Sequence, residues 1–169
     1  MLLIYSILYY SIFLVLAFYY AKPKELGFRK TDFLMDVIYA LMFLSLMLLA
    51  TMIIGVIGHA IGMEEDMEKV SEVIEQSIPE YLIVTVLIGS FVEEIFFRGF
   101  LQPRVGLVPA SVIFGFLHVG YGSLTEVLAA TVLGLLLGIL FQKRKNIYAP
   151  ILAHLLFNFI MITGALVVP

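Results

Sequence analysis

The sequence predicts an all-α fold: a polytopic membrane helix bundle of about six transmembrane segments, forming a single membrane domain over residues 1–169. Composition is the first observation behind this prediction. The 169 residues are 62% hydrophobic and only 14% charged, with a mean hydropathy of +1.08, whereas soluble domains are about half apolar. The second observation is the grouping of apolar residues into runs near the roughly 20 residues that a helix needs to cross a bilayer. We therefore expect the lipid bilayer to surround the chain.

Six apolar segments can be delimited along the chain. The first has no charged leader and runs to Ala21 without a small-residue cleavage site, so we interpret it as a retained span. The second is long enough to tilt or to project beyond the bilayer, and the fourth is too short to cross it alone. The expected bounds are about 2–21, 33–62, 81–101, 107–119, 124–141 and 147–168.

Lysine and arginine are unevenly distributed among the polar connections. Eight of the ten lie in residues 22–30, 102–106 and 142–146, which are the first, third and fifth connections. Because cytoplasmic loops carry an excess of these residues, we expect those connections in the cytoplasm of a cell-membrane protein and both termini outside. The acidic connection at 64–80 is interpreted as a solvated amphipathic helix that ends before Pro79.

Several kinds of chemistry are absent from the sequence. The chain contains no cysteine, which excludes disulfides, thiolate metal ligands and a cysteine nucleophile. Its ten basic residues form short clusters without interleaved aromatic residues, so nucleic-acid binding is not expected. Neither HExxH nor GxSxG occurs, and Ser90, Ser111 and Thr85 lack the surroundings of a nucleophile elbow.

The third segment carries ionisable residues inside an apolar run. Glu93, Glu94 and Arg98 lie in its second half, where such groups usually face a bundle interior or a wet cavity and indicate a functional site. Glu94 and Arg98 are four residues apart and neighbours on one helix face, so we expect an ion pair that lowers the cost of immersing both. Glu93 points about 100° away and needs partners from other segments.

Two histidines on other segments are the candidate partners of Glu93. His118 ends FGFLH in the fourth segment, and His154 begins HLLFN in the sixth, one helical turn before Asn158. The remaining ionisable residues of the apolar segments are interpreted as lying near segment ends without a catalytic role: Asp36, His59 and Glu126.

Depth in the membrane groups four of these side chains. At about 1.5 Å per residue, Glu93, His154 and Asn158 lie roughly 10 to 16 Å from the ends of their helices at the basic connections, and His118 roughly 20 Å. We therefore expect four polar side chains from three helices near the membrane midplane, in an active site that opens to the cytoplasmic side.

A carboxylate, two imidazoles and a carboxamide in one place can hydrolyse a peptide bond. The carboxylate and one imidazole can hold and deprotonate a water molecule, while the other imidazole and the carboxamide donate N–H groups to the oxyanion that forms. The set predicts an endopeptidase that forms no covalent intermediate.

Three motifs on successive segments carry a family resemblance. EEIFFR (Glu93 to Arg98), FGFLH (ending at His118) and HLLFN (His154 to Asn158) resemble the EExxxR, FxxxH and HxxxN/B motifs of the CAAX prenyl endopeptidase and bacteriocin-processing (Abi, CPBP) family of intramembrane glutamate proteases. The resemblance covers about residues 81–160, which would be the catalytic core.

The resemblance implies roles for the motif residues. Glu93 and His118 would activate water, His154 and Asn158 would form the oxyanion hole, and Glu94 and Arg98 would support them. It implies a peptide or protein substrate, with the prenylated tail of a CAAX protein, cut to release its C-terminal tripeptide, as one possibility.

Three other readings of the same residues stay open. His118, His154 and a glutamate could form a His2Glu zinc site, although we expect no metal or other cofactor because HExxH is missing. The buried carboxylates and histidines could be the relay of a proton-linked transporter or channel. A non-catalytic membrane protein of the bacteriocin-immunity type could keep the fold and the ion pair alone.

Overall fold

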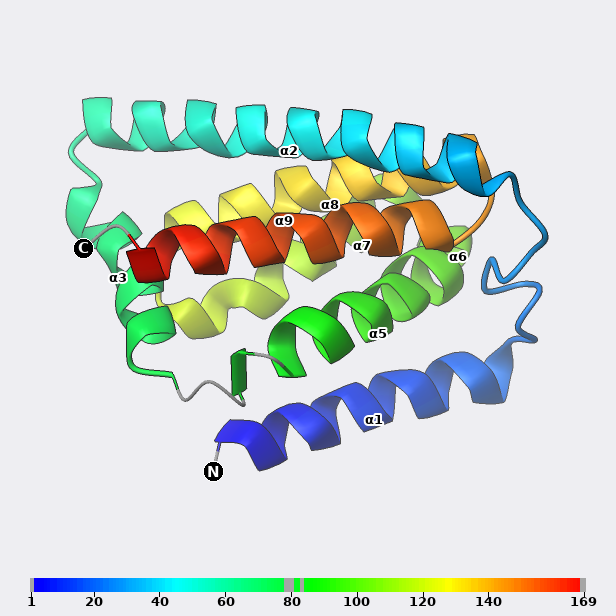
Figure 1. Cartoon of the computed structure of the whole chain (residues 1–169). Coiled ribbons are helices and arrows are strands. Elements are labelled where there is room, and N and C mark those ends of the chain that lie inside the picture. Colours follow the sequence, from blue (N-terminus) through cyan, green and yellow to red (C-terminus); the bar gives the residue numbers. More distant parts are fainter. Residues whose placement is uncertain (1, 78–80, 83, 168–169) are drawn as a thin grey trace.

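The computed structural model describes residues 2–77, 81–82 and 84–167, and these form helices joined by turns, with no strand among them. The long helices run alongside one another, and α3 lies across one end of the bundle (Figure 1). The helices outside the third predicted segment are α1 (Leu2–Tyr20), α2 (Phe33–Ala60), α3 (Glu64–Glu75), α7 (Leu107–Phe116), the 3₁₀-helix η3 (Leu117–Tyr121), α8 (Leu124–Arg144) and α9 (Tyr148–Val167). The predicted all-α membrane bundle is confirmed.

The third predicted segment is helical but changes pitch along its length. It comprises the π-helix η1 (Val84–Gly89), α5 (Ser90–Glu94), the π-helix η2 (Ile95–Leu101) and α6 (Gln102–Val105). Wide π turns are rare and are frequent at functional sites, and here they flank the short α-helical stretch that carries both glutamates.

The main hydrophobic core joins three helices. Its buried residues come from α2, α8 and α9, and include Met47, Leu137 and Ala153, none of which is exposed. Small residues let α8 approach its neighbours: a Cβ on Gly134 would lie 3.2 Å from Ser111 and Phe114 of α7. The third segment packs against α8 and α9 of this group.

A second group of contacts attaches α1 and the third segment. Phe13 of α1 stacks on Phe96 with ring centroids 4.0 Å apart, and Phe97 meets Phe114 of α7 edge-on at 5.0 Å. Aromatic pairs of this kind contribute beyond the apolar area that they bury. The helix that carries the glutamates is thus fixed between α1 and α7.

An ionic cluster connects the start of α2 with the turn between α8 and α9. The Arg144 Nε donates to Asp36 Oδ1 at 2.7 Å, and Asn146 Nδ2 donates to the same oxygen at 2.8 Å. Asn146 Oδ1 also accepts from the backbone N–H of Tyr148 and so caps α9. Asp36 lies near a segment end, as expected, in the first turn of α2, and it is 2% exposed.

The acidic connection is not merely a solvated linker. As predicted, it forms a helix, α3, which ends at Glu75; Pro79, before which the helix was expected to end, lies outside the described residues. Asp66 of α3 accepts hydrogen bonds from the Leu124 and Thr125 backbone N–H groups and from the Ser123 hydroxyl. These bonds attach α3 to the first turn of α8.

The apolar helices match the dimensions of a bilayer. Among the described residues, three helices are long and apolar enough to cross it, Phe33–Ala60, Leu124–Arg144 and Tyr148–Ala165, and two shorter apolar helices, Ile4–Tyr20 and Leu107–Tyr121, accompany them. Large apolar side chains such as Ile12, Met52 and Phe159 are exposed on the outer faces of these helices, where lipid chains would cover them. The chain is an integral membrane protein.

Candidate active site

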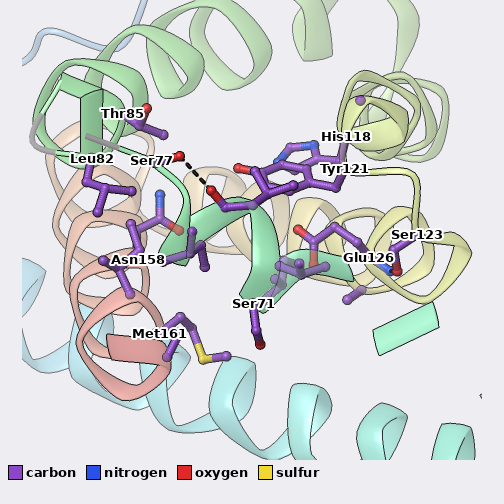
Figure 2. A pocket seen from close by; sticks show the side chains of 18 of the residues that line it. Ser71, Ser77, Leu82, Thr85, His118, Tyr121, Ser123, Glu126, Asn158 and Met161 are labelled. Carbon is purple, nitrogen blue, oxygen red and sulfur yellow. Dashed lines mark hydrogen bonds between the residues drawn. The ribbon is translucent and has the colours of Figure 1, made fainter. Parts of the chain in front are cut away.

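The four side chains singled out from the sequence line one cavity. Glu93, His118, His154 and Asn158 all border a hollow of about 680 Å³ between the helices. Figure 2 shows His118 and Tyr121 on one side of it and Asn158 and Met161 on the other. These four side chains come from three separate elements of the chain, α5, η3 and α9, and are brought to a common space.

The cavity lies in the half of the bundle that carries α3. Its lining includes Ser71 and Ser77 from the acidic connection, whereas no residue of 22–30, 102–106 or 142–146 borders it. In Figure 1 the connections from α1 to α2 and from α8 to α9 lie at the end opposite α3. The prediction that the site opens on the side of the basic connections is therefore corrected. The sequence could not decide between the two sides, because residues near the middle of a helix are about equally far from both ends.

Glu94 and Arg98 form the predicted ion pair. Arg98 Nη1 lies 3.1 Å from Glu94 Oε1, and the two side chains are 2% and 0% exposed. The contact misses hydrogen-bond geometry, so we attribute it to charge rather than to a directed bond. The guanidinium also donates to the Gly134 carbonyl at 3.4 Å and lies over the Phe114 ring, 4.5 Å from its centroid. Arg98 thus links the third segment to α7 and α8.

His154 stands between the two glutamates. Its Nδ1 lies 2.8 Å from Glu94 Oε1, and its Nε2 lies 3.9 Å from Glu93 Oε2. The Glu94 carboxylate, which is paired with Arg98, accepts the hydrogen bond, so the His154 ring donates it from Nδ1. This bond fixes the orientation of the ring. The side chains of Glu93 and His154 are 15% and 6% exposed. Glu94 thus contacts both Arg98 and His154, whereas the sequence suggested only general support from it.

The tautomer of His118 is set by its own helix. Its Nδ1 lies 2.9 Å from the carbonyl oxygen of Phe114, and a carbonyl can only accept, so Nδ1 carries the proton. In the neutral ring, Nε2 then has a free lone pair. The ring also stacks near Tyr121, with centroids 6.1 Å apart.

Asn158 has a partner that the sequence analysis did not assign. Its Nδ2 donates to the Ser90 hydroxyl at 3.1 Å, which fixes the amide on the cavity wall. Ser90 is fully buried and does not line the cavity, so it serves as a support and not as a nucleophile. The sequence signal that could have placed Ser90 near the site is its position four residues before Glu94, one turn away on a helix.

Two further ionisable residues were given no catalytic role from the sequence. Glu126 lies near a segment end, as expected, in the first turn of α8, and it borders the same cavity as Glu93. The Nδ1 of His59 lies 2.9 Å from Glu64 at the exposed turn between α2 and α3. His59 stays outside the site, as predicted, because it does not line the cavity.

Residues 75–160, just over half of the chain, match the family described as type II CAAX prenyl endopeptidase Rce1-like. The chain belongs to this family. The resemblance drawn from the three motifs is confirmed, and the Rce1-like match contains all six motif residues discussed above.

Two curated relatives come from Bacillus subtilis (strain 168). One is named "Uncharacterized protein YpbD" and is 38% identical over 85 residues, which are 50% of this chain and 44% of that protein. The other is named "Putative membrane peptidase YdiL" and is 36% identical over 108 residues, 58% of this chain and 42% of that protein. The chain thus spans less than half the length of either relative. No solved structure shows significant similarity to it.

Proposed function

We propose that the protein is an intramembrane endopeptidase that hydrolyses a peptide bond with an activated water molecule. The observation that carries the proposal is the arrangement around His154: held by Glu94 at 2.8 Å, it presents Nε2 to Glu93 at 3.9 Å on the wall of a cavity. Membership of the Rce1-like family and the printed name of one relative, a membrane peptidase, support the same class of reaction.

The position of Glu93 suits a general base. A gap of 3.9 Å is too long for a direct hydrogen bond, but a single water oxygen can hydrogen-bond to both atoms at ordinary distances. Such a water would be held at the carboxylate that removes its proton. His118, with its Nδ1 proton committed to Phe114, can accept a second hydrogen bond from the same water through Nε2.

Two side chains are available to the oxyanion. Attack on the peptide carbonyl places a negative charge on its oxygen, and N–H donors fixed in advance stabilise that charge. Asn158 is held by Ser90 and keeps a second amide hydrogen for this purpose. His154, when protonated at Nε2, is the second donor, and its orientation is fixed by Glu94.

The proposed mechanism uses no metal ion and no other cofactor. No group of three His, Cys, Asp or Glu side chains within the described residues is arranged as a metal site. Full activity after dialysis against EDTA is the expected result. Loss of activity that zinc restores would replace this proposal with the His2Glu site.

The proposed substrate is a peptide or protein segment presented from the membrane, with a prenylated CAAX tail as the candidate that the family name suggests. From the distribution of lysine and arginine we propose that residues 22–30, 102–106 and 142–146 face the cytoplasm and that both termini face outside. The cavity then lies in the outer half of the bundle, towards α3.

The test uses purified protein in detergent. A farnesylated CAAX peptide and its unprenylated counterpart are incubated with the native chain and with Glu93→Gln, and the products are identified by mass spectrometry. We expect cleavage by the native chain and a loss of at least about a hundredfold in Glu93→Gln. Equal cleavage by both proteins would refute the mechanism. Proton flux in proteoliposomes that depends on Glu93, without any cleavage, would favour the transporter instead.

A further inference from the structure

Glu126 places a second carboxylate on the wall of the cavity. It lies in the first turn of α8 and borders the cavity together with Glu93. Figure 2 shows Glu126 and Tyr121 on one side of this pocket, across from Asn158 and Met161. Within the described residues, no hydrogen bond or ion pair engages the Glu126 carboxylate. An ionisable group at such a site in a membrane protein calls for a function.

Capping of α8 does not account for Glu126. Ser123 is the N-cap, and its hydroxyl accepts from the Glu126 backbone N–H at 3.1 Å. In a capping box, the glutamate three residues after the cap would return to the N-cap backbone N–H. At the N-terminus of α8, the carboxylate that accepts from the backbone belongs instead to Asp66 of α3. It accepts from the Leu124 N–H at 3.0 Å and from the Thr125 N–H at 2.9 Å. The Glu126 side chain is therefore left to face the cavity.

The rest of the described lining carries no lysine or arginine to balance these glutamates, and its basic groups are the imidazoles of His118 and His154, the latter beside Glu93. No lysine or arginine among the described residues borders the cavity, and Arg98, the nearest buried cation in sequence to Glu93, is engaged with Glu94 outside the lining. Five tyrosines contribute their rings to the wall: Tyr5, Tyr9, Tyr10, Tyr81 and Tyr121. Carboxylates attract cations, and aromatic faces add to that attraction.

We propose that Glu126 is a specificity-determining residue that binds a basic side chain, lysine or arginine, of the peptide substrate. The inference rests on the proposed peptidase function and names its substrate class. An apolar peptide with one positive charge fits a cavity that is lined by the catalytic groups, by tyrosines and by Glu126. A segment with a negative charge at the same place is disfavoured, because Glu93 and Glu126 repel it.

The test compares peptides that differ in one charge. Internally quenched ten-residue apolar peptides, acetylated and amidated at their ends, carry lysine, norleucine or glutamate at each position in turn. For the native chain we expect kcat/KM to be about 10- to 100-fold higher with lysine than with norleucine at one position, the range given by hydrogen bonds to charged groups. Glutamate at that position should be the poorest substrate.

Variants of Glu126 assign the preference to this residue. Glu126→Gln should bring the lysine-to-norleucine ratio close to one, and Glu126→Lys should make glutamate the preferred residue. Glu72→Gln is the matched control, because Glu72 is exposed on α3 and does not line the cavity; its ratio should equal that of the native chain. A native ratio near one at every position, or a ratio that Glu126→Gln leaves unchanged, overturns the inference.

A binding measurement separates this inference from the proposed function. The Glu93→Gln protein, which should not cleave, is titrated with the same peptides carrying a fluorescent label, and anisotropy gives Kd. Tighter binding of the lysine peptide that is lost in Glu93→Gln/Glu126→Gln supports the role of Glu126 even if the native chain cleaves none of the peptides. Cleavage that depends on Glu93 but shows no charge preference refutes Glu126 alone. Absence of both binding and cleavage refutes both proposals.

Discussion

Replacing Arg98 with alanine should strongly destabilise the protein and lower its folded yield. Arg98 and Glu94 are 2% and 0% exposed and 3.1 Å apart, so Arg98→Ala leaves the glutamate buried with only His154 beside it. Removing one partner of a buried ion pair costs about 3 to 5 kcal/mol, which is roughly 150- to 4,000-fold in the folding equilibrium. That is a large part of the roughly 5 to 15 kcal/mol by which proteins are stable.

The assay for Arg98→Ala is folded yield and thermal stability. Because the chain contains no tryptophan, the yield is measured by size-exclusion chromatography of a fluorescent fusion, and unfolding by circular dichroism at 222 nm. Arg104→Ala is the matched control, since Arg104 is exposed in the same region of the chain, and it should lose at most about 1 kcal/mol. The double change Glu94→Gln/Arg98→Met removes both charges and should recover much of the yield. Native-like yield and melting of Arg98→Ala would refute the reasoning, because it would mean that water reaches the pair.

Three further predictions address the oxyanion donors, α3 and orientation. Asn158→Ala should retain its fold and lose about 10²- to 10³-fold in kcat, whereas His154→Ala should also lose folded yield because Glu94 loses its 2.8 Å partner; an Asn158→Ala variant with native kcat excludes the donor role. The backbone N–H of Thr125 and the other hydrogen bonds at the start of α8 hold the pKa of Asp66 well below its ordinary value, so its stabilising effect is complete above about pH 4 and is lost as pH falls through the lowered pKa. The melting temperature of Asp66→Ala should therefore lie below that of the native chain at pH 7 and approach it in strong acid, and a gap that does not change with pH contradicts this. In intact cells, an impermeant maleimide should label Ser71→Cys and should reach Lys24→Cys only after permeabilisation; the opposite pattern reverses the proposed orientation.

The apolar pattern was sufficient to predict the helices because bilayer length and hydrophobicity constrain each segment separately. The bounds of α2 and α8 differ from expectation by two or three residues, since Gly62 and Lys145, both with positive φ, set the turns that end these helices. The ion pair of Glu94 and Arg98 could be predicted because its members are local. The π turns on either side of α5 could not, because no residue type signals a change of pitch.

Contacts between distant segments were less accessible from the sequence. From their depth along the helices, we correctly predicted that four side chains lie together: Glu93, His118, His154 and Asn158. Depth did not show which histidine lies beside Glu93. It also could not say which end of the bundle holds the cavity. The place of Glu126 on the cavity wall could not be predicted for a related reason: its release from helix capping depends on Asp66, which is 60 residues earlier in the chain.

The proposed catalytic role of Glu93 is tested most directly by the rate of peptide cleavage in a folded Glu93→Gln protein. Glu93→Gln changes a single atom of a cavity-lining side chain, so its chromatographic profile and melting temperature should match those of the native chain. The cleavage rate of any peptide that the native chain hydrolyses should fall by at least about a hundredfold. A folded Glu93→Gln protein that cleaves at the native rate would show that the water is activated elsewhere.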